Sequence, residues 1–176
     1  TIRDNDALGL TVGDTGETLI KENRFSGNGG DSLTWNHRPA GGSALTLAPG
    51  TNASITDCVF SGNGRAGDPY GAVLCYGDGP RVTSLEVTGC RFVGNYGEQG
   101  AAVYARNLEE ASVRDCSFTG NISDTRKAIL AVHYMEKFTV ENCTIRDNDA
   151  LGLTVGDTGE TRSEEHTSEL QSLLII

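Results

Sequence analysis

The sequence is poor in the residues that build large globular cores and nucleic-acid interfaces. Apolar residues occupy 37% of the 176 positions and aromatic residues 6%, with 4 prolines and 1 tryptophan. Basic residues are also scarce, because 14 Lys and Arg stand against 24 Asp and Glu, for a formal net charge of −10. Binding to a phosphate backbone requires clustered positive charge. We therefore expect no nucleic-acid partner.

Long hydrophobic runs are missing as well. No stretch approaches the ~20 apolar residues that a membrane-spanning helix needs, so no membrane span is expected in this chain. There is no heptad pattern either. Glycine is abundant, at 23 residues. Abundant glycine without a helical period favours a turn-rich all-β chain that forms one domain or part of one.

The chain contains a short repeat instead. Five segments share an aromatic residue or isoleucine followed three positions later by asparagine: NRFSGN, CVFSGN, CRFVGN, CSFTGN and CTIRDN. A sixth segment, TIRDN, begins the chain. Successive anchors, from Ile2 to Ile145, are 23 to 35 residues apart. Such spacing is typical of repeat architectures.

Each repeat also holds a second short apolar strand after the asparagine and a third before the next anchor. These strands are too short for tight hairpins within a repeat. Each must therefore pair with the matching strand of the next repeat, in parallel and ~4.8 Å away. Crossover connections between parallel strands are right-handed. The sequence thus predicts an all-β right-handed parallel β-helix, a solenoid of about five to six coils.

Residues at equivalent positions should then stack along the solenoid axis. Asparagine tolerates left-handed backbone angles and can pass hydrogen bonds between coils, while aromatic anchors favour an internal apolar stack. One cysteine precedes each of four successive anchors by two positions, and parallel Cβ vectors disfavour disulfides between them, so we expect buried free thiols. The predicted ladders are Asn5, Asn28, Asn63, Asn95, Asn121 and Asn148; Phe25, Phe60, Phe92, Phe118 and Ile145; and Cys58, Cys90, Cys116 and Cys143.

The second strands should contribute inward-facing pairs to the same interior. The predicted pairs are Leu45/Leu47, Val73/Cys75, Val103/Ala105, Leu130/Val132 and Leu153/Val155.

The F-x-x-N segments, each followed by a degraded G-G-A-[ILV] such as GGSAL, YGAV or QGAAV, resemble right-handed parallel β-helix repeat proteins. They are most similar to polymorphic outer-membrane-type repeats and more distantly to the pectate-lyase-like superfamily. The resemblance implies an extracellular or cell-surface location and polysaccharide or glycan partners. This fold carries enzymes and adhesins alike. We expect a non-catalytic scaffold for adhesion or glycan binding; the alternative is a fragment of a polysaccharide lyase or glycoside hydrolase.

The carboxylate arrangement of such enzymes is interrupted in this sequence. The resemblance to pectate lyases implies acidic residues clustered on one strand for Ca²⁺, but Gly89 stands between Asp57 and Asp115 at their shared coil position. No catalytic residue is therefore predicted. The acidic turns RDND (146–149) and GDTGE (156–160) suit weak Ca²⁺ binding, with simple solvation as the alternative. No other cofactor or metal site is expected, since paired C-x-x-C spacing is missing.

Loop length indicates the best candidate binding surface. Two adjacent coils carry long insertions, at 29–42 and 64–71, and YGEQ (96–99) follows at the same corner. Aromatic side chains beside planar polar groups suit sugar stacking, and binding residues favour loops on rigid scaffolds. We predict a weak glycan site here, with packing of the tryptophan inside its own loop as the alternative. The candidate residues are Trp35, His37, Arg38, Arg65, Asp68, Tyr70, Tyr96 and Glu98.

The first eighteen letters, TIRDNDALGLTVGDTGET, recur unchanged at 144–161. Other coils share only four or five letters, so this identity indicates a real 143-residue tandem repeat or a seam of sequence assembly. RSEEHTSELQS (162–172) lacks the coil pattern and resembles a translated sequencing adapter. We predict a fragment of a longer β-helix at 1–161 and a non-native tail at 162–176. Exposed strand edges at its two ends would permit edge-to-edge self-association.

Overall fold

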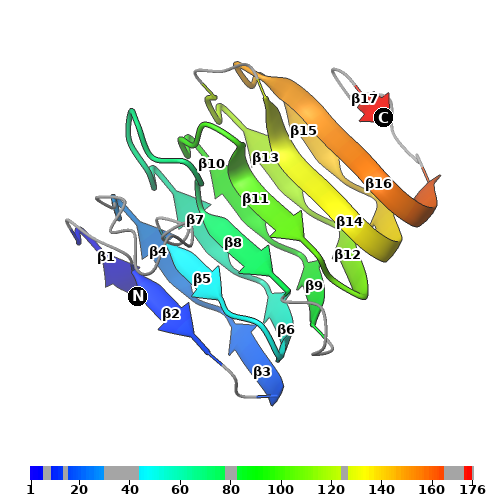
Figure 1. Ribbon diagram of the computed structural model, residues 1–176. Coiled ribbons are helices and arrows are strands. Elements are labelled where there is room, and N and C mark those ends of the chain that lie inside the picture. Colours follow the sequence, from blue (N-terminus) through cyan, green and yellow to red (C-terminus); the bar gives the residue numbers. More distant parts are fainter. Residues whose placement is uncertain are drawn as a thin grey trace.

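The computed structural model describes residues 1–5, 9–13, 16–29, 44–77, 83–123, 127–164 and 173–175. Within these ranges the chain forms seventeen strands and contains no helix. The strands wind in successive coils around a common axis, and every strand pair is parallel (Figure 1). The all-β parallel β-helix predicted from the repeat is confirmed, with six coils marked by the six anchor strands.

The anchor strands form one sheet in the order of their coils. Isoleucine or phenylalanine lies in register with its counterpart in each neighbouring coil. The strands are β1 (Ile2–Arg3), β4 (Arg24–Ser26), β7 (Val59–Ser61), β10 (Arg91–Val93), β13 (Ser117–Thr119) and β15 (Thr144–Arg146).

The second sheet combines two rows of strands. One row contains β2 (Leu10–Val12), β5 (Leu45–Leu47), β8 (Val73–Tyr76) and β11 (Gly100–Arg106). The other row contains β3 (Gly16–Lys21), β6 (Thr51–Thr56), β9 (Ser84–Thr88) and β12 (Glu110–Arg114). Both rows continue into β14 (Ala128–Glu141) and β16 (Leu151–Glu164), and β17 (Leu173–Ile175) pairs with β16.

The fourteen-residue strands β14 and β16 differ from the short strands expected in every coil. In the second coil, Pro49 and Gly50 form a turn that separates β5 from β6. The sequence of β14 has no proline or glycine at the equivalent corner. The chain turns there at Tyr134, which has φ of 53° while its neighbours keep strand pairing. One strand therefore crosses two faces of the solenoid.

Besides the corner at Tyr134, two corners have left-handed backbone angles that recur from coil to coil. The residue before each ladder asparagine is glycine or aspartate, as at Gly62 with φ of 61° and Asp147 with φ of 56°. The second corner holds Asp57, Gly89 and Asp115, with φ of 52°, 64° and 53°. Glycine and aspartate accept this conformation at low cost. The alternation of these residue types at one coil position therefore has a backbone reason.

The interior is built from side chains that occupy equivalent positions in successive coils and stack on one another. The phenyl rings of Phe25, Phe60, Phe92 and Phe118 follow one another with centroids 4.8, 4.9 and 4.8 Å apart. Ile145 continues the stack in register with Phe118 and is fully buried. The inward-facing pairs predicted for the second strands are all buried to 1% exposure or less. The core is thus a narrow apolar column along the axis.

The asparagines form a continuous ladder beside this column. From Asn5 to Asn148, each side-chain Nδ2 donates to the Oδ1 of the next coil's asparagine, at 2.7 to 3.0 Å. Asn63 shows the full pattern: its backbone N also donates to Asn95 Oδ1 at 3.1 Å, and its Nδ2 donates to the Phe25 carbonyl at 3.1 Å. The four inner asparagines are fully buried. Each ladder position therefore satisfies main-chain groups as well as its neighbours.

Replacement of Asn95 by alanine should destabilise the solenoid strongly. It removes the acceptor of the Asn63 backbone N and Nδ2 and the donor to the Phe60 carbonyl, at about 1–3 kcal/mol for each buried group left unpaired. Asn121 Oδ1 loses one of its two donors and keeps the backbone N of residue 95. Asn52→Ala is the matched control, because Asn52 faces outward and accepts one hydrogen bond from Ser84. Urea unfolding should show a much larger loss for Asn95→Ala. Equal midpoints for both variants would contradict a stabilising ladder.

Candidate functional site

The corner predicted to bind glycans is only partly described. Trp35, His37 and Arg38 lie outside the described residues. The loops at 64–71 and 96–99 do lie side by side, because the backbone N atoms of Glu98 and Gln99 donate to the carbonyls of Asp68 and Pro69, each at 2.9 Å. Adjacent coils therefore meet at this corner as the sequence predicts.

The described side chains of this corner mainly make contacts within the protein. Asp68 is 5% exposed, and its Oδ2 accepts the backbone N–H of Arg65 at 2.9 Å, which closes the turn between them. The Arg65 side chain passes over Gly29 of the preceding coil. Tyr96 and Glu98 are half-buried.

Tyr70 requires a correction. The sequence predicts that its ring stacks against a sugar, but the residue is 5% exposed and its ring centroid lies 4.7 Å from that of Tyr104. Burial raises the pKa of the Tyr70 hydroxyl to about 12. The ring belongs to an apolar cluster outside the main column, together with Leu74, Ala128 and Ala131. Its surface is covered by the protein and does not offer a stacking platform.

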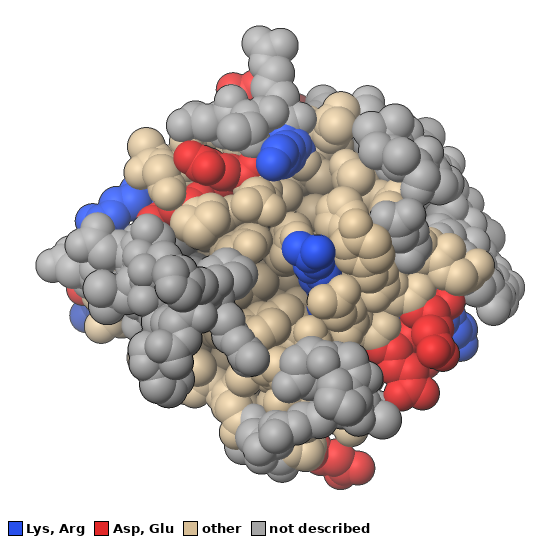
Figure 2. Space-filling view, in the orientation of Figure 1, with Lys and Arg blue, Asp and Glu red and all other residues tan. Residues whose placement is uncertain are grey.

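The molecule has a broad, mainly uncharged face in the orientation of Figure 1, with acidic side chains gathered toward its margins (Figure 2). This face includes the second-strand row of β8, β11 and the first half of β14. Its outward positions carry Leu74, Tyr104 and Ala131, all of which are buried. These three positions expose little side-chain surface, and among the described residues a polar surface that could hold a hydrophilic ligand lies elsewhere.

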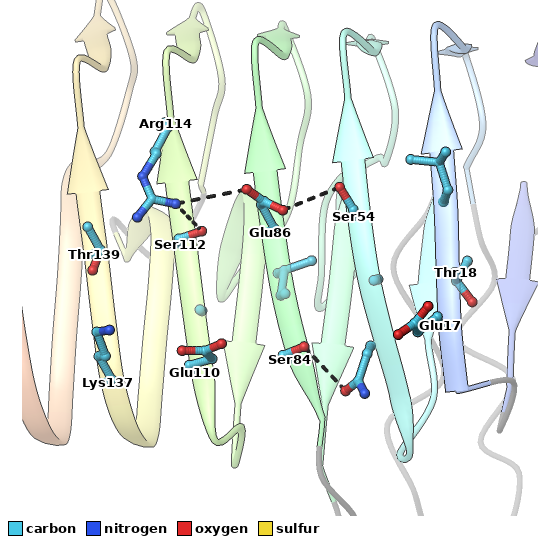
Figure 3. A pocket seen from close by; sticks show the side chains of 15 residues that line it. Glu17, Thr18, Ser54, Ser84, Glu86, Glu110, Ser112, Arg114, Lys137 and Thr139 are labelled. Carbon is cyan, nitrogen blue, oxygen red and sulfur yellow. Dashed lines mark hydrogen bonds and ion pairs between the residues drawn. The ribbon is translucent and has the colours of Figure 1, made fainter.

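Such a surface follows the third-strand row, on the outside of β3, β6, β9, β12 and the second half of β14 (Figure 3). Buried and outward residues alternate in β6, β9 and β12, so that in β9 Leu85 and Val87 are buried while Ser84 and Glu86 face out. In the second half of β14, Phe138, Thr139 and Val140 are all buried. The outward side chains line a shallow groove of about 610 Å³. Its lining includes Glu17, Leu19, Asn52, Ser54, Ser84, Glu86, Glu110, Ser112, Arg114, Lys137 and Thr139.

The strand register arranges these side chains in rows that run from coil to coil. Each row repeats one position of the third strand, so hydroxyl, amide and charged groups succeed each other at the strand spacing of ~4.8 Å. The three rows are Asn52, Ser84, Glu110 and Lys137; Ser54, Glu86, Ser112 and Thr139; and Thr56, Thr88, Arg114 and Glu141.

Arg114 is the centre of the polar network in the groove (Figure 3). Its Nε lies 2.9 Å from Glu141 Oε2, and its Nη1 donates to Ser112 Oγ at 2.8 Å. The same Nη1 is 4.0 Å from Glu86 Oε1, while Ser54 Oγ donates to Glu86 Oε2 at 3.5 Å. The guanidinium side chain is about one-third exposed, at 36%. It therefore links three coils across the groove floor.

The groove was not predicted from the repeat pattern, although the sequence carries a signal for it. The third strands read TNASIT, SLEVT, EASVR and KFTVE, each with polar residues at every second position. That alternation indicates one solvent-facing side. It does not indicate that the side is hollowed or which coils contribute to it.

The cysteines lie in successive coils as the repeat predicts, with Cys58, Cys90 and Cys116 buried and Cys143 partly buried. Cys58, Cys90, Cys116 and Cys143 are free thiols in successive coils, and the backbone N of Cys58 and of Cys90 each donates to the next coil's sulfur at 3.4 Å. Hydrogen bonding to a neighbouring thiol and burial raise the pKa of Cys58 and of Cys116. Cys75 is fully buried on β8, and burial raises its thiol pKa from 9.0 to about 12.

Two further observations concern the described ranges. No set of three or more His, Cys, Asp and Glu side chains in them is placed to hold a metal ion. No helix in that part of the chain is long and apolar enough to span a bilayer.

Parallel coils, stacked side-chain ladders and a polar groove along one outer face define a β-helix scaffold. The chain belongs to the right-handed β-helix region family, whose model matches residues 1–122 and again residues 39–168. Comparisons with curated proteins and with solved structures returned no match.

Burial of Cys75 predicts a pH-dependent loss of stability. Burial raises the pKa of the thiol in the folded chain to about 12. The contribution of the protonated thiol to the free energy of unfolding is therefore complete below pH ~9. It is lost as the pH rises toward ~12, because the unfolded thiol ionises first. Cys75→Ala should remove about 2 kcal/mol of the alkaline destabilisation near pH ~10.5. Urea unfolding of both proteins at neutral and alkaline pH checks this. The same pH dependence in the variant would contradict it.

Proposed function

We propose that this chain is a secreted or cell-surface β-helix scaffold that binds an extended glycan, without cleaving it, in the groove over β3, β6, β9, β12 and β14. The observation that carries the proposal is one row of polar side chains that continues along the groove across five coils: Glu17, Asn52, Ser84, Glu110 and Lys137. A polymer of repeating units matches such a surface, because each coil presents a polar side chain at the same strand position.

The chemistry of the lining supports a carbohydrate ligand. Ser54, Ser84 and Ser112 offer hydroxyl groups in neighbouring strands, and Glu110 and Lys137 add an acceptor and a donor in register with each other. Sugars present hydroxyl groups that both donate and accept hydrogen bonds. The Lys137 ammonium would additionally favour an acidic sugar.

The arrangement of Arg114 supports binding rather than reaction. General acid–base catalysis requires a proton donor or acceptor directed at the substrate. Arg114 is committed to Glu141, Ser112 and Glu86, and so orders the groove floor instead. Because a shallow solenoid face buries little of a ligand, we expect affinity in the micromolar to millimolar range.

Lys137→Gln should weaken binding of acidic polysaccharides about fivefold, since it removes one exposed charge contact. The matched control is Arg91→Gln, which removes an exposed charge from the anchor sheet, away from the groove. A glycan array followed by titration of the strongest ligand measures both variants. Equal loss in the two variants would indicate unspecific charge attraction and contradict the proposal.

Two further experiments distinguish this proposal from a glycan site at the long loops and from a polysaccharide lyase. Binding that depends on Trp35→Ala and is indifferent to Lys137→Gln would locate the site at the corner of long loops. Formation of unsaturated products from acidic polysaccharides in the presence of Ca²⁺ would show a lyase and contradict a non-catalytic scaffold.

A further inference from the structure

Tyr134 has a backbone conformation that disfavours its side chain. It turns the corner of β14 with φ of 53°, in the left-handed region that bulky residues rarely adopt. The preceding coil holds Asn107 at the same corner, with φ of 56°. In the part of the chain that the structure describes, every other non-glycine residue with positive φ is aspartate, asparagine or glutamate. Strained residues of this kind cluster at functional sites, so the Tyr134 ring is a candidate for binding.

The Tyr134 ring is also accessible. The residue is 49% exposed, whereas Tyr70 and Tyr104 are buried and Tyr76 and Tyr96 are half-buried. Every described phenylalanine is buried as well. Tyr134 therefore offers the most accessible aromatic surface among the described residues.

Arg106 lies over this ring. Its guanidinium carbon is 5.0 Å from the centroid of the Tyr134 ring, within the range of a cation–π contact. Arg106 is exposed at the end of β11, in register with Tyr76 on one side and His133 on the other. Its guanidinium makes no ion pair or hydrogen bond with any residue that the structure describes. The ring thus positions a charged fork whose five N–H donors remain available to a ligand.

The neighbouring coil holds the ring from another side. A Cβ atom at Gly156 would lie 2.8 Å from His133 Nδ1, so glycine at this position leaves room for the imidazole over β16. The centroids of the His133 and Tyr134 rings are 6.4 Å apart. The imidazole therefore borders the Tyr134 ring and limits its movement.

We propose that Arg106 and Tyr134 form a binding site for an oxyanion carried on a sugar ring, either a carboxylate or a sulfate ester. A guanidinium binds two oxygens of such a group through parallel hydrogen bonds. The exposed part of the Tyr134 ring contacts the apolar face of the sugar. Neither residue lines the groove over the third-strand row, so the site is separate from that groove and does not depend on the function proposed for it.

Acidic residues around the site restrict the ligand to a low charge density. Glu109 and Glu136 follow Asn107 and Tyr134 by two positions and are exposed. The backbone N of Glu136 donates to the Glu109 carbonyl at 3.2 Å, so both belong to the same corner. A densely sulfated chain would meet these carboxylates together with Arg106, and like charges repel. A sugar with a single oxyanion fits the corner better.

NMR titration of the full chain with isotopically labelled tyrosine rings tests the site. The probes are D-glucuronate, a glucose sulfate monoester and uncharged glucose. At least one charged sugar should shift the Tyr134 ring signal with a Kd in the millimolar range, and the charged sugar that binds identifies the oxyanion. Glucose at the same concentration should leave the signal in place. Binding of neither charged sugar, or equal binding of glucose, would overturn the proposal.

Two variants of Arg106 and a matched control separate this site from the groove. Arg106→Gln should raise the Kd of the charged sugar about fivefold. Arg106→Lys keeps the charge but loses the planar fork, and should raise it about threefold. Lys137→Gln removes an exposed charge from the groove and should leave the Kd unchanged. Equal loss in Arg106→Gln and Lys137→Gln would indicate unspecific charge attraction and contradict the proposal, while loss of polysaccharide binding in Lys137→Gln alone concerns only the groove.

Tyr134→Asn gives a readout that a purely structural tyrosine would not. It places at the corner the residue type that the preceding coil has there, so it should raise the urea midpoint of unfolding. Binding of the charged sugar, followed by the signals of the sugar itself, should weaken about threefold. A lower midpoint would show that the ring is needed for packing, and unchanged binding would show that it does not contact the sugar; either result would contradict the proposal.

Discussion

The coil-to-coil hydrogen bonds of the buried asparagines are the constraint on which the rest of this structure depends. A parallel strand pair could in principle slip along its neighbour, and a slip of one residue would turn every side chain to the opposite face. The amide ladder prevents this, because Asn63 and Asn95 must meet each other and the carbonyls of Phe25 and Phe60 at the same time. The stacks of phenyl rings and thiols follow from that register.

The same register creates the polar groove on the outside. Ser84, Glu86 and Thr88 alternate with core residues on β9, and the ladder holds them level with their counterparts on β6 and β12. A surface of this kind is a property of stacking and not of any single coil. It also explains why Arg114 can reach Glu86 in one neighbouring coil and Glu141 in the other.

A stack held together between neighbours has no intrinsic end, since each coil carries the surface that the next coil needs. The strand β17 occupies part of that surface on β16. The first and sixth coils share a ladder asparagine preceded by a left-handed aspartate, but they differ at a later corner, where Gly16 has φ of 68° and the equivalent Gly159 lies inside the continuous strand β16.

The sequence by itself determined the architecture and the interior. The spacing of Phe60, Phe92 and Asn95 predicts parallel coils, the stacked rings and the amide ladder, because these features repeat a local backbone pattern in which side-chain direction follows position. Only the tertiary structure decided the merged strand β14, where the corner at Tyr134 forms without glycine or proline. It also decided that Tyr70 is covered by Tyr104 and that polar outward residues border a groove. Those outcomes depend on how neighbouring coils and loops pack against each other, which no single repeat encodes.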